Sequence, residues 1–167
     1  LYFMLGLPTE TEDDIEQIAV LSDKIAREYY TIPKSERNGK VSITTSTSFF
    51  VPKPFTPFQW TRMAKQEEFI AKRKLLSAKL KEQLNNKSIK YNWHDAELTM
   101  LEGVFARGDR KLCDLLVTAY NNGCIFDSWS EHFKFDMWVK SFEECGLTMD
   151  FYNLREREEK ELLPWDF

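Results

Sequence analysis

The chain has 167 residues and a mass of 19.8 kDa, the size of one domain or of a domain with a small appendage. Hydrophobic residues make up 43% and charged residues 30% of the sequence, proportions that exclude a disordered or collagen-like chain. The formal net charge of −4 argues against a globally basic nucleic-acid-binding protein, although it leaves room for a local basic patch.

The first fifty residues predict a strand, a helix and a second strand. Residues 1–5 are all apolar, as in a fully buried strand of a parallel sheet, and residues 6–10 form a turn. Thr11 is expected to cap the following helix, with Asp14 completing a capping box. Its apolar face is predicted to consist of Ile15, Ile18, Leu21, Ala19, Ile25 and Ala26.

Alternating apolar and β-branched residues over 41–49 predict the second strand, which a right-handed crossover would make a parallel neighbour of the first. Three prolines between residues 52 and 57 then end strand pairing and force an extended loop. A long amphipathic helix rich in Lys and Arg is predicted over 63–84, and a short strand over 89–93.

The remainder is predicted to be mainly helical, with helices near 95–105, 109–120 and 135–144. A tail from residue 154 is expected to dock through Leu162, Leu163 and Trp165. The fold class is therefore α/β, divided into a βα portion over 1–60, a long helix over 61–88 and a mainly helical extension over 89–167.

The cysteines and histidines give no sign of a metal site. Cys113, Cys124 and Cys145 lack the short gaps of zinc or iron–sulfur ligand sets. Because an odd number of cysteines without a signal peptide fits a reducing compartment, we expect a cytoplasmic location. The apolar run at residues 1–5 is far shorter than the about 20 residues that cross a bilayer, so we expect no membrane contact.

Three segments carry candidate chemistry. Gly6 would let the backbone approach a ligand at the carboxyl end of a strand, and an ordinary tight turn is an equally good interpretation. The loop over 50–60 would either wall a pocket or serve as a stiff connector. Arg107 and Arg110, at a helix–helix junction, would point outward and bind phosphate or carboxylate, although a capped turn with solvated arginines is the favoured interpretation. Asp95 after His94 is expected to cap a helix rather than to orient a catalytic base.

Two segments carry a family resemblance. Leu-Tyr-Phe-Met-Leu-Gly-Leu-Pro-Thr-Glu-Thr at residues 1–11 and Ser-Phe-Phe-Val-Pro-Lys-Pro-Phe-Thr-Pro-Phe-Gln-Trp at 48–60 resemble radical S-adenosylmethionine (radical SAM) proteins. The closer resemblance is to the branch with a cobalamin-binding-type domain upstream of the barrel. Later segments, including Trp-His-Asp and Leu-Pro-Trp-Asp, resemble the region that follows the barrel in that branch.

The resemblance implies a partial (β/α)₆ barrel in which a Cys-x-x-x-Cys-x-x-Cys loop holds a [4Fe–4S] cluster that cleaves SAM. This sequence lacks that motif. The chain would therefore be a C-terminal barrel fragment with a helical extension, without catalytic residues, metal or cofactor of its own and inactive alone. SAM, the cluster and, as an open question, cobalamin would belong to the parent enzyme.

The resemblance also assigns roles to residues. Gly6, Pro8 and Glu10 match the family's Gly-x-Pro-x-Glu pattern near the SAM-binding side, where Glu10 either contacts cofactor or caps the helix. Lys53, Thr56 and Phe58 match the rim loop and, with Arg107 and Arg110, would lie on the substrate side. The expected partner is the remainder of the barrel.

A non-catalytic module that binds RNA or a protein is the alternative, and ribosomal RNA or tRNA would be its nucleic-acid partners. The cations over 65–81 favour it, while a solvated helix face remains the simpler interpretation. An unpaired strand edge at residues 1–5 also predicts self-association of the isolated chain.

Overall fold

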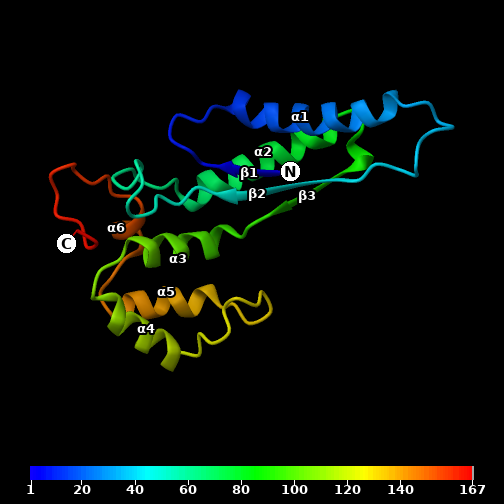
Figure 1. Ribbon diagram of the computed structural model, residues 1–167. Helices are drawn as coiled ribbons and strands as arrows, with labels where there is room; N and C mark the ends of the chain where they lie inside the picture. Colours follow the sequence, from blue (N-terminus) through cyan, green and yellow to red (C-terminus); the bar gives the residue numbers. More distant parts are fainter. Residues whose placement is uncertain (167) are drawn as a thin grey trace. The chain divides into compact units, whose positions relative to one another are not determined.

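A computed structural model of the chain describes residues 1–166, which form an α/β structure with a three-stranded parallel sheet and six α-helices (Figure 1). The chain divides into two compact units. The first contains Leu1–Phe50 and Lys65–Ala96, and the second contains Val51–Ala64 and the chain from Glu97 onward.

The first unit is built from β1 (Tyr2–Leu5), α1 (Glu12–Thr31), β2 (Ile43–Phe49), α2 (Gln66–Glu82), a short 3-10 helix η1 (Asn86–Ser88) and β3 (Ile89–Trp93). The strands pair in the order β1-β2-β3, and both pairs are parallel. Tyr2 lies opposite Ser46, and Ile43 lies opposite Ile89. The predicted strands and the parallel pairing of the first two are confirmed.

Both long helices of this unit pack on one face of the sheet. Thr45 of β2 shares a hydrogen bond of 2.9 Å with Ser22 of α1. Phe49, on the same side of β2, packs against Phe69 of α2 with ring centroids 4.5 Å apart. Because residues 45 and 49 of one strand point to the same side, α1 and α2 cover the same face. The core between them contains Leu5, Ile15, Ala19, Ala26, Ile43, Leu76 and Leu80.

The opposite face of the sheet is polar. It carries Thr44, Ser46 and Ser48 of β2 with Lys90 and Asn92 of β3, as the alternation of side chains requires. Tyr2 and Met4 of β1 lie on this face, and Tyr2 is 91% exposed. The prediction of a fully buried first strand is therefore wrong, because β1 lies at the edge of the sheet and only Leu5 is buried.

The predicted start of the first helix is confirmed. Thr11 accepts a hydrogen bond from the Asp14 amide, and the Asp14 carboxylate accepts one from the Thr11 amide, which forms a capping box. The inward face of α1 includes Ser22 and Asp23, while the predicted core residues Leu21 and Ile25 are partly exposed.

The second unit contains most of α3 (Ala96–Arg107) and all of α4 (Leu112–Asn121), α5 (Phe135–Glu144) and α6 (Met149–Asn153). Its core is formed by Leu101, Val104, Leu115, Ala119, Trp138, Phe142 and Tyr152. The predicted helix over 135–144 is confirmed, and α6 was not predicted. Among residues 1–166, no helix is long and apolar enough to cross a membrane.

The loop between β2 and α2 is anchored within the second unit. The Met63 amide donates to the Asn153 carbonyl at 2.7 Å, and the Arg157 amide donates to the Trp60 carbonyl at 2.9 Å. Met63 is fully buried in this loop. The helix α2 begins at Gln66 rather than at the predicted residue 63. In the tail, Leu163 and Trp165 are buried as predicted, whereas Leu162 is exposed, contrary to the prediction.

Candidate functional site

The carboxyl ends of the three parallel strands lie together at one end of the sheet, which is where parallel α/β folds place their ligand sites. Gly6 follows β1, Phe50 follows β2 and His94 follows β3. The Phe50 amide donates to the Leu5 carbonyl at 2.8 Å, and the His94 amide donates to the Thr47 carbonyl at 3.0 Å. The residues at this end of the sheet form the candidate functional site.

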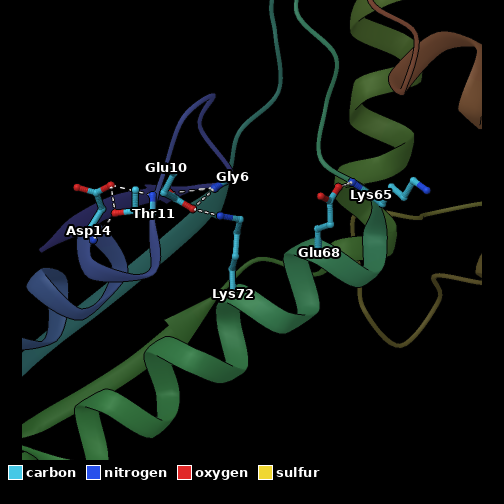
Figure 2. A network of polar contacts seen from close by, with 7 residues as sticks. All are labelled: Gly6, Glu10, Thr11, Asp14, Lys65, Glu68 and Lys72. Atoms are coloured by element: carbon cyan, nitrogen blue, oxygen red, sulfur yellow. Dashed lines mark hydrogen bonds and ion pairs between the residues drawn. The ribbon is translucent and has the colours of Figure 1, made fainter.

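A closed polar network holds the turn after β1 (Figure 2). The Gly6 amide donates to both carboxylate oxygens of Glu10, at 3.1 and 3.0 Å. Lys72 of α2 contributes its ammonium group to Glu10 Oε2 at 2.7 Å. The Glu10 side chain is only 6% exposed, so this buried carboxylate fixes the turn and joins it to α2.

Figure 2 also shows that the contacts of Glu10 are distinct from the contacts that cap α1. The capping contacts of α1 are made by Thr11 and Asp14, one step further along the chain. Those hydrogen bonds, foremost the one from the Thr11 amide, lower the pKa of Asp14 below its usual value. At the start of α2, the Lys65 amide donates to the Glu68 carboxylate at 2.6 Å. Of the two roles considered for Glu10, capping of the helix is not what the structure has, because its carboxylate bonds the Gly6 amide and Lys72 instead.

Gly6 has a φ of +89°, a conformation that favours glycine. A Cβ atom at this position would lie 2.5 Å from Cε1 of Phe69. The close approach that the glycine permits inside this chain is therefore to an aromatic ring of α2. Pro8 is half-buried in the turn that follows.

A pocket of about 410 Å³ lies on the polar face of the sheet. Its lining includes Tyr2, Ser46, Ser48, Asn92 and His94, which come from all three strands. These side chains offer hydroxyl, amide and imidazole groups that donate and accept hydrogen bonds. Of these residues, His94 alone was considered from the sequence, as a catalytic base. Small polar residues at every second position of β2 are the signal that marks such a face.

The predicted rim-loop residues belong to the second unit. Lys53 forms an ion pair with Glu102 of α3, and the Thr56 hydroxyl donates to the Lys53 carbonyl at 2.8 Å. Phe58 is 41% exposed. Lys53 and Thr56 are therefore in contact with each other, and the charge of Lys53 is matched by an acidic side chain.

The arginines at the junction of α3 and α4 behave differently from each other. Arg110 is exposed, as expected. Arg107 is completely buried, so the prediction that it points to solvent is wrong. Burial foremost, and then the charges of Arg157 and Arg155, lower the pKa of Arg107 to about 10. Asp109 accepts from the Lys111 amide at 3.0 Å and lies before the N-cap position of α4.

The residues of this chain do not fit a [4Fe–4S] cluster. Cys113 is exposed, Cys124 is buried and Cys145 is half-buried, and the Cys145 thiol contacts the Thr118 hydroxyl at 3.4 Å. In the described part of the chain, no three His, Cys, Asp or Glu side chains form a metal-binding group. The Gly6 amide donates to the Glu10 carboxylate, so both groups are already engaged and the polar face of the sheet, rather than this turn, presents groups to a small molecule.

Several cations of α2 are engaged within the first unit. Lys72 pairs with Glu10, Lys79 pairs with Glu16 at 2.9 Å, and the Arg73 guanidinium stacks over the Trp93 ring at 4.8 Å. Lys74 and Lys81 are exposed. The basic helix therefore presents fewer unpaired charges than its sequence suggests.

Comparison with known proteins gives one distant relative. The chain is 27% identical over 147 residues to the "Uncharacterized protein MJ0966" of Methanocaldococcus jannaschii. The match covers 88% of this chain but only 29% of that protein. No family profile and no solved structure matches the chain.

Proposed function

We propose that this chain is the C-terminal part of a radical SAM barrel, followed by a mainly helical extension, and that its parent protein is the enzyme. The observation that carries the proposal is the winding of the first unit. Its strands follow one another in the order β1-β2-β3, all parallel, with α1 and α2 on the same face. Strands that advance in one direction with their helices on one face are the repeating arrangement of a βα barrel. One half of a doubly wound sheet has the same arrangement before its strand order reverses.

The edges of the sheet support the same proposal. Within residues 1–166, β1 and β3 each pair with β2 alone. In a closed barrel the outer edges of such strands pair with further strands. The remainder of the parent barrel would supply them, and the polar face with Ser46, Ser48 and Asn92 would then line the barrel interior.

The residues present in this chain indicate which roles it would have and which roles the rest of the parent protein would have. The cluster and its cysteine ligands would come from the parent outside this chain, where the cluster supplies the electron that cleaves SAM. Here the Gly6–Glu10–Lys72 network holds the turn beside β1 in place. The polar face presents neutral hydrogen-bonding groups, and the loop with Lys53, Thr56 and Phe58 would serve the substrate side.

The length of the relative is consistent with this arrangement. The chain spans less than a third of the M. jannaschii protein that it matches. A protein of that length has room for the remaining strands and for a domain upstream of them. Whether cobalamin takes part is decided by that upstream region.

The gene that encodes the chain gives the first test. We expect a Cys-x-x-x-Cys-x-x-Cys motif within the couple of hundred codons before residue 1. The complete gene product, reconstituted with iron and sulfide and reduced in the presence of SAM, is expected to release deoxyadenosine, whereas the 167-residue chain alone releases none. A parent without the motif, or a reconstituted parent without deoxyadenosine, refutes the proposal.

A matched pair of variants tests the polar face. Asn92→Ala removes a group that lines the pocket and is expected to lower the yield of deoxyadenosine or of product. Lys90→Ala, two residues earlier on the same face and outside the pocket, is the control and is expected to leave the yield unchanged. Equal yields from the two variants refute a role for this pocket.

The alternative function, a module that binds RNA or a protein, has weaker support because α2 engages several of its cations internally. It predicts binding to tRNA or ribosomal RNA that weakens with salt and depends on Lys74 and Lys81. Absence of binding at low salt would exclude RNA as the partner.

A further inference from the structure

Two arginines lie side by side in the interior of the second unit. Arg107 ends α3 and is 0% exposed, and Arg157 follows α6 and is 6% exposed. Arg157 Nη2 donates to the Arg107 carbonyl at 3.1 Å, and Arg107 Nη1 donates to the Asn153 carbonyl at 3.4 Å. The two guanidinium groups therefore share one buried neighbourhood, although residues 107 and 157 are far apart in sequence.

Most donors of this pair have no acceptor. Nε and Nη2 of Arg107 and Nε and Nη1 of Arg157 are buried and make no hydrogen bond with the described residues. Asn153 Oδ1, a neutral acceptor, is also buried and makes no hydrogen bond with the described residues. One amide oxygen satisfies neither four donors nor two positive charges.

The acidic side chain whose charge acts on Arg157, Glu161, is already used. Glu161 takes both terminal nitrogens of Arg155 in a bidentate contact at 2.7 Å. Two buried cations without a counter-ion are costly, because desolvation penalises each and their charges repel. Burial foremost lowers the pKa of both Arg107 and Arg157. The charges of Arg157 and Arg155 lower the pKa of Arg107 further, whereas for Arg157 the charge of Arg155 lowers the pKa and that of Glu161 raises it. The arrangement lacks a negative charge.

We propose that Arg107 and Arg157 bind an oxyanion, a phosphate or a carboxylate, whose oxygens accept the unused donors of the two guanidinium groups. Guanidinium forks match the geometry of these anions and hold them through paired, charge-assisted hydrogen bonds. The site differs from the predicted pair of Arg107 with Arg110, because Arg110 is exposed and Arg157 takes its place. It does not depend on the radical SAM proposal.

A neighbouring pocket lies beside the segments that carry the two arginines. This pocket, of about 590 Å³, is lined by Gly108, Asp109 and Arg110, which directly follow Arg107, and by Leu163, Pro164 and Asp166. The latter residues flank Trp165, over whose ring the Arg157 guanidinium stacks at 5.3 Å. Asp109 and Asp166 also line this pocket, where they accept hydrogen bonds from the Lys111 and Leu163 amides.

Thermal unfolding of the complete 167-residue chain tests the proposal. Inorganic phosphate and acetate are titrated separately, with sodium chloride added to keep the ionic strength constant. At an anion concentration ten times its Kd, a single site is expected to raise Tm by about 3–6 °C. A response to phosphate alone identifies a phosphate site, and a response to acetate alone identifies a carboxylate site. Either supports the proposal.

Variants assign the response to the pair. Arg157→Gln is expected to abolish the rise in Tm, because it removes one of the two guanidinium groups. Arg157→Lys keeps the charge but loses the fork, and at least a tenfold weaker apparent affinity is expected. Arg110→Gln, at the exposed arginine, is the control and is expected to respond like the wild type.

The proposal is overturned if neither anion raises Tm in a saturable manner beyond chloride. It is also overturned if Arg157→Gln and Arg157→Lys retain the wild-type response. If Arg107→Gln does not fold, the two Arg157 variants still decide the question.

Discussion

Replacing Gly6 with alanine places a methyl group where a ring already lies. The added Cβ would be 2.5 Å from Cε1 and 3.1 Å from Cδ1 of Phe69. Phe69 is fully buried and packs against Phe49, so its ring has little room to move. The positive φ costs an alanine about 1–2 kcal/mol, and overpacking costs a further 1–3 kcal/mol or so. We therefore expect Gly6→Ala to lower the free energy of unfolding by about 2–5 kcal/mol.

Gly39 provides a matched control within the same unit. Its φ is +82°, close to that of Gly6, but a Cβ added there meets no atom within 4 Å. Gly39→Ala is therefore expected to cost only the backbone contribution, about 1–2 kcal/mol. Urea unfolding measures both variants, and hydrogen exchange of β1 and α2 localises the loss. Equal losses for the two variants would refute the steric argument at Gly6.

Three further substitutions test contacts of the first unit. Asp23→Ala removes a buried carboxylate that accepts from the half-buried Asn85 amide at 2.8 Å and from the exposed Arg27 side chain, and we expect a loss of about 1–3 kcal/mol in urea unfolding. Burial opposes ionisation of Asp23, but its hydrogen bonds outweigh this effect and lower its pKa. The wild type should therefore lose this stability as the pH falls through the lowered pKa, whereas Asp23→Ala should show no such step. Thr11→Ala removes the cap of α1 and should cost about 1 kcal/mol, with faster hydrogen exchange confined to the first turn. Glu10→Gln should cost about 1–3 kcal/mol, and a double-mutant cycle with Lys72→Met should show a coupling energy well above zero; additive losses would contradict the network.

Self-association is a separate expectation for the isolated chain. The outer edge of β1 carries unpaired backbone groups beside the exposed Tyr2. Sedimentation velocity is expected to show association that increases with concentration, and hydrogen exchange at residues 1–5 should slow as the concentration rises. A monomer at all concentrations would contradict this expectation.

Local patterns were sufficient to predict most elements of the fold. The alternation of Ile43, Thr45, Thr47 and Phe49 defines both β2 and its buried face. Thr11 and Asp14 mark the start of α1 because a capping box needs only four consecutive residues. By contrast, the five residues of α6 are too few for a helical period to be visible, and the exposure of Tyr2 depends on β1 being an edge strand, which no local pattern reveals.

The candidate site was predictable only in its location. The strand ends at Gly6 and Phe50 follow from parallel pairing, but the bond between Glu10 and Lys72 joins residues that are 62 positions apart. Likewise, the residues next to Arg107 in the sequence suggest a solvated side chain. Its burial depends on Asn153 and Arg157, which lie near the far end of the chain. Long-range contacts of this kind need the folded structure.

The loop between β2 and α2 also constrains the order in which the chain matures on the ribosome. Residues 51–64 leave the exit tunnel early, yet Trp60 and Met63 find their backbone partners only at Arg157 and Asn153. β1, α1 and β2 can assemble as they emerge, whereas the buried side chain of Met63 must wait until nearly all of the chain has been synthesised. This interval leaves an apolar, proline-rich arm accessible to chaperones, and any early stop before α6 would make that exposure permanent.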